Sequence, residues 1–284
     1  MEARSFIVDD YNLSIVLIDA HSHILDEAFD GVRGNLENFL KSRKIVWIEN
    51  AIDLEQSEFI VKNYGDKWLY ALGIHPHEAE KYSSNLKETK SKLTDLIDSS
   101  TPVAIGEVGL DFFKNYSSRE AQYRIFDLML EIALEKSLPV EVHCRACADE
   151  LHSILKEYPG TIIFHSFTGS VKLLELGLEK GWYFSLSAIV ESALLRNDKR
   201  RLKVYSNIPL ERILLETDSP YLRPKTVSFE IPEFIEMASK KSGMHINIPY
   251  AITAVAKILE KVLSVNENLI LSKSAENAVR VFKI

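Results

Sequence analysis

Residues 102–144, PVAIGEVGLDFFKNYSSREAQYRIFDLMLEIALEKSLPVEVHC, decide the fold that this sequence predicts. Short apolar runs at 102–107 and 139–144 each predict a buried strand. Between them, residues 118–137 repeat apolar side chains at helical spacing, which predicts an amphipathic helix. A buried strand, a helix and a second buried strand are typical of parallel strands that are covered by helices.

The same alternation runs along most of the chain. The predicted strands are 14–20, 44–49, 68–73, 102–107, 139–144, 161–165, 182–187 and 212–218. Eight such units without a long linker favour a closed (β/α)8 TIM barrel over an open doubly wound sheet. The open sheet would also require a Gly-rich phosphate loop after an early strand, and the sequence has none.

We therefore expect a single domain over residues 1–284, with the barrel at about 14–222. Residues 1–13 form a short N-terminal extension, and 223–284 form a C-terminal helical region with helices at about 249–263 and 265–282. Residues 222–246 fall outside the strand and helix pattern.

Composition limits the mode of binding. The formal net charge of −7 argues against a wide groove that follows a nucleic-acid backbone, because such grooves neutralise several phosphates. Two cysteines in 284 residues make no disulfide framework, which predicts a cytoplasmic location. The first residues do not form a signal peptide, and no run of 18 apolar residues predicts a membrane span.

Histidine and acidic residues collect at the predicted strand ends, where barrels of this class carry their active sites. In chain order they are His21, His23, His75, Glu107, His143, His165 and Asp218. Five of these seven are histidines, from eight in the whole chain, and chance would scatter them over helices and loops. His21 and His23 are two residues apart, so on a strand their imidazoles project side by side and can hold a divalent metal.

The candidate ligands outnumber the needs of one zinc-like ion, which takes three or four. The predicted metal ligands are His21, His23, Glu107, His143, His165 and Asp218. Glu107 can bridge two ions, as hydrolases with two metals require. We expect two divalent ions of zinc, manganese or magnesium.

The motifs IDAHSH, ALGIHPH, AIGEVGLDF, VHCR, FHSFTG and LLETDSPYL together resemble the TatD family of metal-dependent deoxyribonucleases. The resemblance covers about residues 16–222 and resumes at 247–262. It implies a TIM barrel, a site with two metals that uses the same six ligands, and hydrolysis of DNA phosphodiesters, often from the 3′ end. This sequence differs from the family at 222–246, where an acidic and apolar insert replaces a basic Arg-Gly stretch.

The remaining site residues are assigned to supporting roles. We expect Asp218 to act as general base as well as ligand, with Glu107 as the other catalytic residue. His75 and Arg145 are candidate substrate contacts, Asp111 is a candidate partner that orients the ligand imidazoles, and His77 is expected to be a capping or surface residue. Single aromatics near the strand ends, such as Phe112, Phe113, Phe167 and Tyr221, serve either for stacking on bases or for packing.

The preferred function is thus a metal-dependent deoxyribonuclease, most simply an exonuclease, with DNA as its substrate. We expect no membrane association, no obligate protein partner and a monomer. Two alternatives remain open because a fold does not fix its chemistry: a hydrolase of an amide, lactone or aminoacyl ester, and a metal-binding scaffold without catalysis.

Overall fold

The computed structural model describes residues 16–284. The predicted N-terminal extension, residues 1–13, lies outside the described residues, as do the first two positions of the strand predicted at 14–20.

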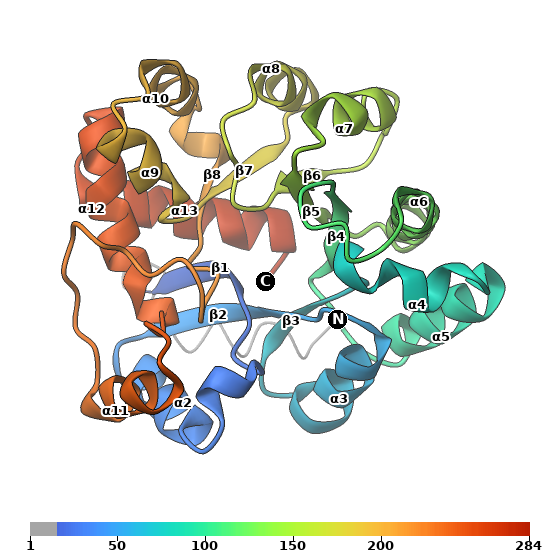
Figure 1. Ribbon diagram of the computed structural model, residues 1–284, viewed down its shortest axis with the longest axis horizontal. Coiled ribbons are helices and arrows are strands. Elements are labelled where there is room, and N and C mark those ends of the chain that lie inside the picture. Colours follow the sequence, from blue (N-terminus) through green and yellow to red (C-terminus); the bar gives the residue numbers. More distant parts are fainter. Residues whose placement is uncertain (1–15) are drawn as a thin grey trace. The chain divides into compact units, whose positions relative to one another are not determined.

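Each predicted strand region overlaps a strand within residues 16–284, and the strands follow one another in a single sheet in the order β1 to β8 (Figure 1). They are β1 (Leu17–Ser22), β2 (Ile45–Asn50), β3 (Leu69–Leu72), β4 (Ala104–Asp111), β5 (Val140–Arg145), β6 (Ile162–Phe164), β7 (Tyr183–Leu186) and β8 (Ile213–Leu215). The pairs β1–β2, β3–β4, β4–β5, β5–β6 and β7–β8 are parallel.

Helices separate consecutive strands, and this alternation confirms the predicted (β/α)8 class. The α-helices are α2 (Arg33–Ser42), α3 (Leu54–Tyr64), α4 (Ala79–Ser83), α5 (Leu86–Asp98), α6 (Arg119–Lys136), α7 (Ala148–Leu155), α8 (Val171–Lys180), α9 (Ile189–Leu195), α10 (Lys199–Ser206), α11 (Glu233–Ser242), α12 (Ile252–Leu263) and α13 (Glu267–Phe282). Short 3-10 helices are η1 (Glu27–Phe29), η2 (Pro76–Glu78), η3 (Leu210–Arg212) and η4 (Pro249–Ala251).

The described residues divide into two compact units, and each is described by itself. The β1–β8 unit contains residues 16–49, 166–169 and 184–284, and the β3–β6 unit contains 50–165 and 170–183. The single domain over residues 1–284 stays a prediction.

In the β3–β6 unit, helix α6 packs against β4, a strand in which every residue is buried. The helix begins after Ser118, whose side chain accepts a hydrogen bond from Ala121 N, and it ends at Ser137, which has a φ of +55°. Ile125 and Met129, spaced by one turn, are buried. Caps and apolar spacing therefore agree on the helix that the sequence predicts at 118–137.

In the β1–β8 unit, α12 and α13 lie side by side and α13 packs against β8 (Figure 1). Two buried polar side chains of α13 hold this contact. The hydroxyl of Ser274 accepts a hydrogen bond from Leu215 N at 2.7 Å, and the amide of Asn277 donates to the carbonyls of Leu210 and Ile213 at 2.7 and 2.9 Å. The C-terminal helix thus pairs backbone groups of β8 and of η3.

Two strands end three or more residues away from the predicted position. β4 continues to Asp111, four residues past the expected end, because its last residues keep their pairing register with β5. Glu107 is therefore in the middle of a strand. β8 ends at Leu215 rather than at residue 218, because Asp218 adopts a φ of +55° that an extended strand does not contain.

The insert at 222–246 contains a helix that the sequence analysis missed, α11. Its signals are present in the sequence: Pro232 directly precedes the helix, acidic residues occupy the first turn, and Gly243 follows the last residue with a φ of +72°. The beginning of the insert is held by the buried Glu191, whose carboxylate accepts hydrogen bonds from the backbone N–H groups of Lys225 and Thr226.

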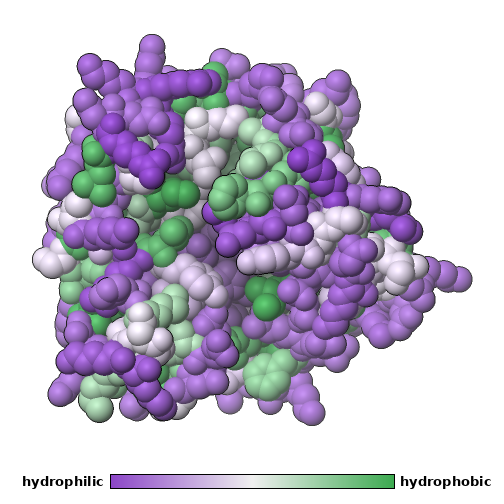
Figure 2. Space-filling view, viewed as in Figure 1, coloured by the Kyte–Doolittle hydropathy of each residue, from purple (hydrophilic) through white to green (hydrophobic). Residues whose placement is uncertain are grey.

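Of the helices in residues 16–284, none is both long enough and apolar enough to cross a bilayer. On the face shown in Figure 2, hydrophilic residues predominate and hydrophobic residues form small separate groups.

We predict that Ser274→Ala and Asn277→Ala each lower the free energy of unfolding by about 1–3 kcal/mol, because each leaves buried backbone groups of the β8 region without a partner. Ser272→Ala, an exposed position on the same helix, serves as the control and should change it by less than about 0.5 kcal/mol. Urea unfolding followed by circular dichroism measures all three. Equal stability of the three variants would contradict this account of the contact.

Candidate active site

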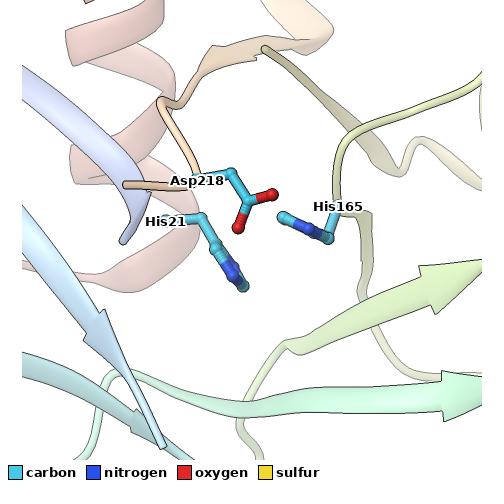
Figure 3. Close-up of side chains that lie close together, drawn as sticks. All are labelled: His21, His165 and Asp218. Atoms are coloured by element: carbon cyan, nitrogen blue, oxygen red, sulfur yellow. The ribbon is translucent and has the colours of Figure 1, made fainter. Parts of the chain in front are cut away.

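The β1–β8 unit brings together His21, His23 and Asp218. The Nε2 atoms of His21 and His23 lie 3.1 Å apart, and Nε2 of His23 lies 3.6 Å from a carboxylate oxygen of Asp218. Both imidazoles are buried. Figure 3 shows the ring of His21 beside the carboxylate of Asp218. Two ring nitrogens at this separation face each other favourably only across a shared proton or a shared cation.

Backbone pairing positions these three side chains. The N–H of Asp218 donates to the carbonyl of His21 at 3.0 Å, and the N–H of His23 donates to the carbonyl of Ser219 at 2.7 Å. The segment after β8 is thereby paired with the end of β1. The φ of +55° at Asp218 turns its side chain out of the strand direction at this point.

Buried acidic residues hold the backbone of the same region in place. Asp19 accepts hydrogen bonds from Thr217 N at 2.8 Å and from the Thr217 hydroxyl, so it joins β1 to the segment after β8. Burial raises the pKa of Asp19 well above its ordinary value. Asp19 also accepts a hydrogen bond from the backbone N–H of His21 at 3.3 Å. Its visible role is therefore to hold the backbone.

Glu49, on β2, fixes the turn that follows His23. Its two carboxylate oxygens accept hydrogen bonds from the N–H groups of Ile24 and Leu25 at 2.7 and 2.9 Å. Burial raises the pKa of Glu49 to about 7. Glu49 is not among the predicted site residues, because a lone acid inside an apolar strand carries no local signal of its long-range partners.

The β3–β6 unit gathers imidazoles around Glu107. One of its carboxylate oxygens lies 2.6 Å from Nδ1 of His143, 3.5 Å from Nε2 of His165 and 3.6 Å from Nε2 of His75. Candidate ligand atoms of His75, Glu107 and His143 all lie within 4.8 Å of one another. Figure 3 also labels His165, whose ring projects from the segment after β6.

The charges in this cluster depend on one another. Burial by itself raises the pKa of Glu107, but the imidazoles of His165, His75 and His143 outweigh it and hold the pKa well below its ordinary value. Burial by itself would lower the pKa of His143. The carboxylates of Glu107 and Asp111 more than offset the effect of burial and raise this pKa to about 10. The carboxylates therefore favour positive charge among the imidazoles, which either a proton or a metal ion supplies.

Close approach of β4 and β5 makes this cluster possible. Gly109 is paired with His143 and has a φ of +141°, and a Cβ at this position would lie 2.2 Å from the carbonyl oxygen of His143. Any other residue would push the two strands apart at the level of the ligands.

Asp111 connects the cluster to the loop that follows β4. One carboxylate oxygen lies 2.8 Å from Nε2 of His77 and 3.4 Å from Nε2 of His143, as expected for a partner that orients imidazoles. The other oxygen accepts hydrogen bonds from the N–H groups of Phe113 and Lys114 at 2.9 Å each. Burial raises the pKa of Asp111, but these hydrogen bonds outweigh it and keep the pKa below its ordinary value.

His77 was expected to be a capping or surface residue, and the structure corrects this. Its ring is half-buried, lies 4.3 Å from the His75 ring centroid and faces Asp111. The sequence carried the signal, because HPH at 75–77 has the same spacing as HSH at 21–23. Pro76 begins the 3-10 helix η2 and thereby turns both rings toward β4.

Arg145 ends β5 with an exposed side chain, and its guanidinium carbon lies 4.2 Å from the ring centroid of Phe113. His75 accepts a hydrogen bond at Nδ1 from the N–H of His77, which places the proton of a neutral ring on Nε2. Nε2 of His75 lies 3.6 Å from a carboxylate oxygen of Glu107, whereas the exposed guanidinium group of Arg145 offers N–H donors that suit anionic oxygens.

Comparison with known proteins shows the family to which the chain belongs. The family model described as TatD related DNase matches residues 18–283. A relative from Erwinia tasmaniensis, the "3'-5' ssDNA/RNA exonuclease TatD", is 36% identical over 179 residues, which is 62% of this chain and 67% of the relative. The protein of the same description from Erwinia billingiae is 37% identical over 181 residues, again covering 62% of this chain and 67% of the relative.

Solved structures share the fold. YJJV, a TatD homologue from Escherichia coli, has a TM-score of 0.77 and 23% identity, covering 95% of this chain and 99% of the other. A TatD family hydrolase from Entamoeba histolytica has a TM-score of 0.75 and 21% identity, covering 94% of this chain and 97% of the other. These likenesses confirm the predicted barrel fold.

We predict that Glu49→Ala lowers the free energy of unfolding by about 2–5 kcal/mol, because it leaves two N–H groups after β1 without an acceptor. Glu27→Ala, an exposed acid in the same unit, is the control and should have little effect. Thermal and urea unfolding of both variants measure the difference. The interpretation fails if Glu49→Ala is as stable as its control.

Proposed function

Because this chain belongs to the TatD related DNase family, we propose that it is a divalent-metal-dependent exonuclease that shortens single-stranded nucleic acid from its 3′ end. Family membership supports hydrolysis of DNA phosphodiester bonds, and the descriptions of the relatives support the polarity and strandedness. Among the geometric observations, the carboxylate of Glu107 within 3.6 Å of three imidazole nitrogens carries the proposal.

TatD family hydrolases depend on metal, and the donor atoms of His75, Glu107 and His143, which all lie within 4.8 Å of one another, fit a divalent cation. Buried imidazole and carboxylate donors within a few ångströms of one another suit zinc, manganese or magnesium. We propose two such ions. Their ligands would be His21, His23, Glu107, His143, His165 and Asp218, with Glu107 as the bridge. Bound ions of this kind lower the pKa of water and neutralise charge on a phosphoryl group.

The chain's own residues then supply proton transfer and substrate orientation. Asp218 is the proposed general base, because its carboxylate extends from a turn beside His21 and His23 and can accept a proton from the attacking water. His75, whose ring lies beside the carboxylate of Glu107, would contact a phosphate oxygen. Arg145 would hold an adjacent phosphate through its guanidinium group.

Asp111 and His77 act on the position of other groups. With one oxygen directed to two imidazoles and the other to two backbone N–H groups, Asp111 keeps His143 oriented while the loop after β4 is folded. This arrangement reduces the reorganisation that ligand binding would otherwise require.

We also propose a cytoplasmic monomer. Cys144 and Cys147, the two cysteines of the chain, are not bonded to each other, which suits a reducing compartment. The nucleic acid is the only partner that the proposed activity requires.

We predict metal-dependent shortening of single-stranded oligonucleotides that carry a label at the 5′ end and have a free 3′ end. The unprotected single strand should be degraded with Mg²⁺, Mn²⁺ or Zn²⁺ and should remain intact with chelator, whereas the 3′-blocked strand should resist. Glu107→Ala should lose at least about 100-fold in rate, since it removes the proposed bridging ligand. Glu157→Ala, an exposed acid in the same unit, should keep full activity.

Other outcomes separate the alternatives. Turnover of lactones, esters or amides without cleavage of any oligonucleotide would replace the nuclease by another hydrolase. Bound metal without turnover of any of these substrates would leave a scaffold protein instead.

We predict that Asp111→Ala weakens metal binding by about 10- to 100-fold, the usual consequence of removing a carboxylate that orients a ligand imidazole. Titration calorimetry with Mn²⁺ measures the affinity directly, without need of a substrate. Asp127→Ala, an exposed acid on α6, is the matched control. Unchanged Mn²⁺ affinity in Asp111→Ala would refute the orienting role.

A further inference from the structure

The loop between β4 and α6, residues 112–118, carries the two most exposed aromatic side chains in residues 16–284. Phe113 is 63% exposed and Tyr116 is 66% exposed, compared with 49% for Phe59 and 46% for Tyr221. Isolated exposed aromatics are common on protein surfaces. These two share one short loop, however, and this loop adjoins the imidazole cluster around Glu107.

Hydrogen bonds hold this loop in place on both sides. Asp111 accepts from the N–H groups of Phe113 and Lys114. The buried amide of Gln122 donates to the carbonyls of Asp111 and Ser117, at 3.2 and 3.0 Å. These hydrogen bonds therefore fix the backbone that carries Phe113 and Tyr116 to the site.

The aromatic surface is continuous with the imidazoles. The ring of Tyr116 meets the ring of His77 edge to face, with centroids 4.7 Å apart. His77 in turn lies 6.2 Å from the ring of His143 and within hydrogen-bonding distance of Asp111. A strand whose phosphate reaches His143 would therefore find an aromatic ring within one or two nucleotides.

Each exposed ring has a cation beside it. The guanidinium carbon of Arg145 lies 4.2 Å from the centroid of Phe113, and Nζ of Lys114 lies 5.7 Å from the centroid of Tyr116. Aromatic faces interleaved with basic groups are the arrangement by which proteins bind single strands, since the rings stack on bases and the cations pair with phosphates. In a chain of net charge −7, such a local concentration of cations complements a polyanion.

We propose that Phe113 and Tyr116 form a stacking platform for unpaired bases next to the scissile phosphodiester, with Arg145 and Lys114 contacting the adjoining phosphates. This inference rests on the proposed nuclease function and names the residues that select its substrate. Bases inside a duplex are already stacked and paired, so the platform favours single strands. Because every base offers a stacking face, it imposes little sequence preference.

The structure also separates this pair from other aromatic candidates. Phe112 and Phe167 are buried, at 7% and 3% exposure, and belong to the packed interior. Neither can receive a base without rearrangement.

The test compares wild type, Phe113→Ala, Tyr116→Ala and the double variant on two single strands: one with normal bases, and one with abasic sugars at the last three 3′ positions. On the normal strand, each single variant should raise KM by about 5- to 100-fold with kcat nearly unchanged, the range for loss of one base–aromatic stack. On the abasic strand the KM of the wild type should rise by a similar factor. The KM of each variant on this strand should then be close to that of the wild type. Fluorescence anisotropy of the same strands should give the same pattern in Kd.

Three controls keep the test decisive. Phe59→Ala, an exposed phenylalanine on α3, should match the wild type. Phe113→Trp and Tyr116→Phe keep a ring and should restore KM on the normal strand, which a merely misfolded loop would not allow. If the wild type cleaves the normal strand while Phe113→Ala and Tyr116→Ala keep its KM, the platform is refuted and the nuclease stands. If the wild type cleaves neither strand, both proposals fall.

Discussion

A carboxylate buried in the middle of a strand is the constraint on which much of this protein depends. Glu107 is 3% exposed, and an ionised group in such a place is unstable without compensating charge or hydrogen bonds. Three imidazoles supply this compensation from separate loops and strands of the same unit. Each of them must therefore be held accurately, and the surrounding structure serves this requirement: Gly109 admits the close approach of β5, and Asp111 orients His143 and His77.

Buried acids recur in the β1–β8 unit, but with a different purpose. Asp19 and Glu49 bind backbone N–H groups or a hydroxyl, and so they fix the end of β1 and the segment that carries Asp218. Such hydrogen bonds replace the water that these groups lose on burial. Acidic residues thus have two uses in this protein. Glu107 requires positive charge nearby, whereas Asp19 and Glu49 hold the backbone in place.

Asp111 links the imidazole cluster to the loop that follows β4. Its two oxygens serve different neighbours, so the orientation of the imidazoles and the fold of the aromatic loop cannot vary independently. Because the loop after β4 is fixed in this way, its side chains lie beside the imidazole cluster around Glu107. In a chain of net charge −7, this loop places two exposed rings beside cations, Phe113 beside Arg145 and Tyr116 beside Lys114.

The sequence by itself determined the alternation of strands and helices, because burial patterns with periods of two and 3.6 residues are local properties that a window of sequence contains. It also placed histidines and acids at the strand ends, from which a metal site was predicted. The tertiary structure alone decided what depends on distant residues: that Glu107 lies inside β4, that His77 faces Asp111 and that Phe113 is exposed whereas Phe112 is buried. Adjacent residues of the same type had opposite environments, because the packing of β5 and α6 around the loop, and not the residue type, sets which ring is covered.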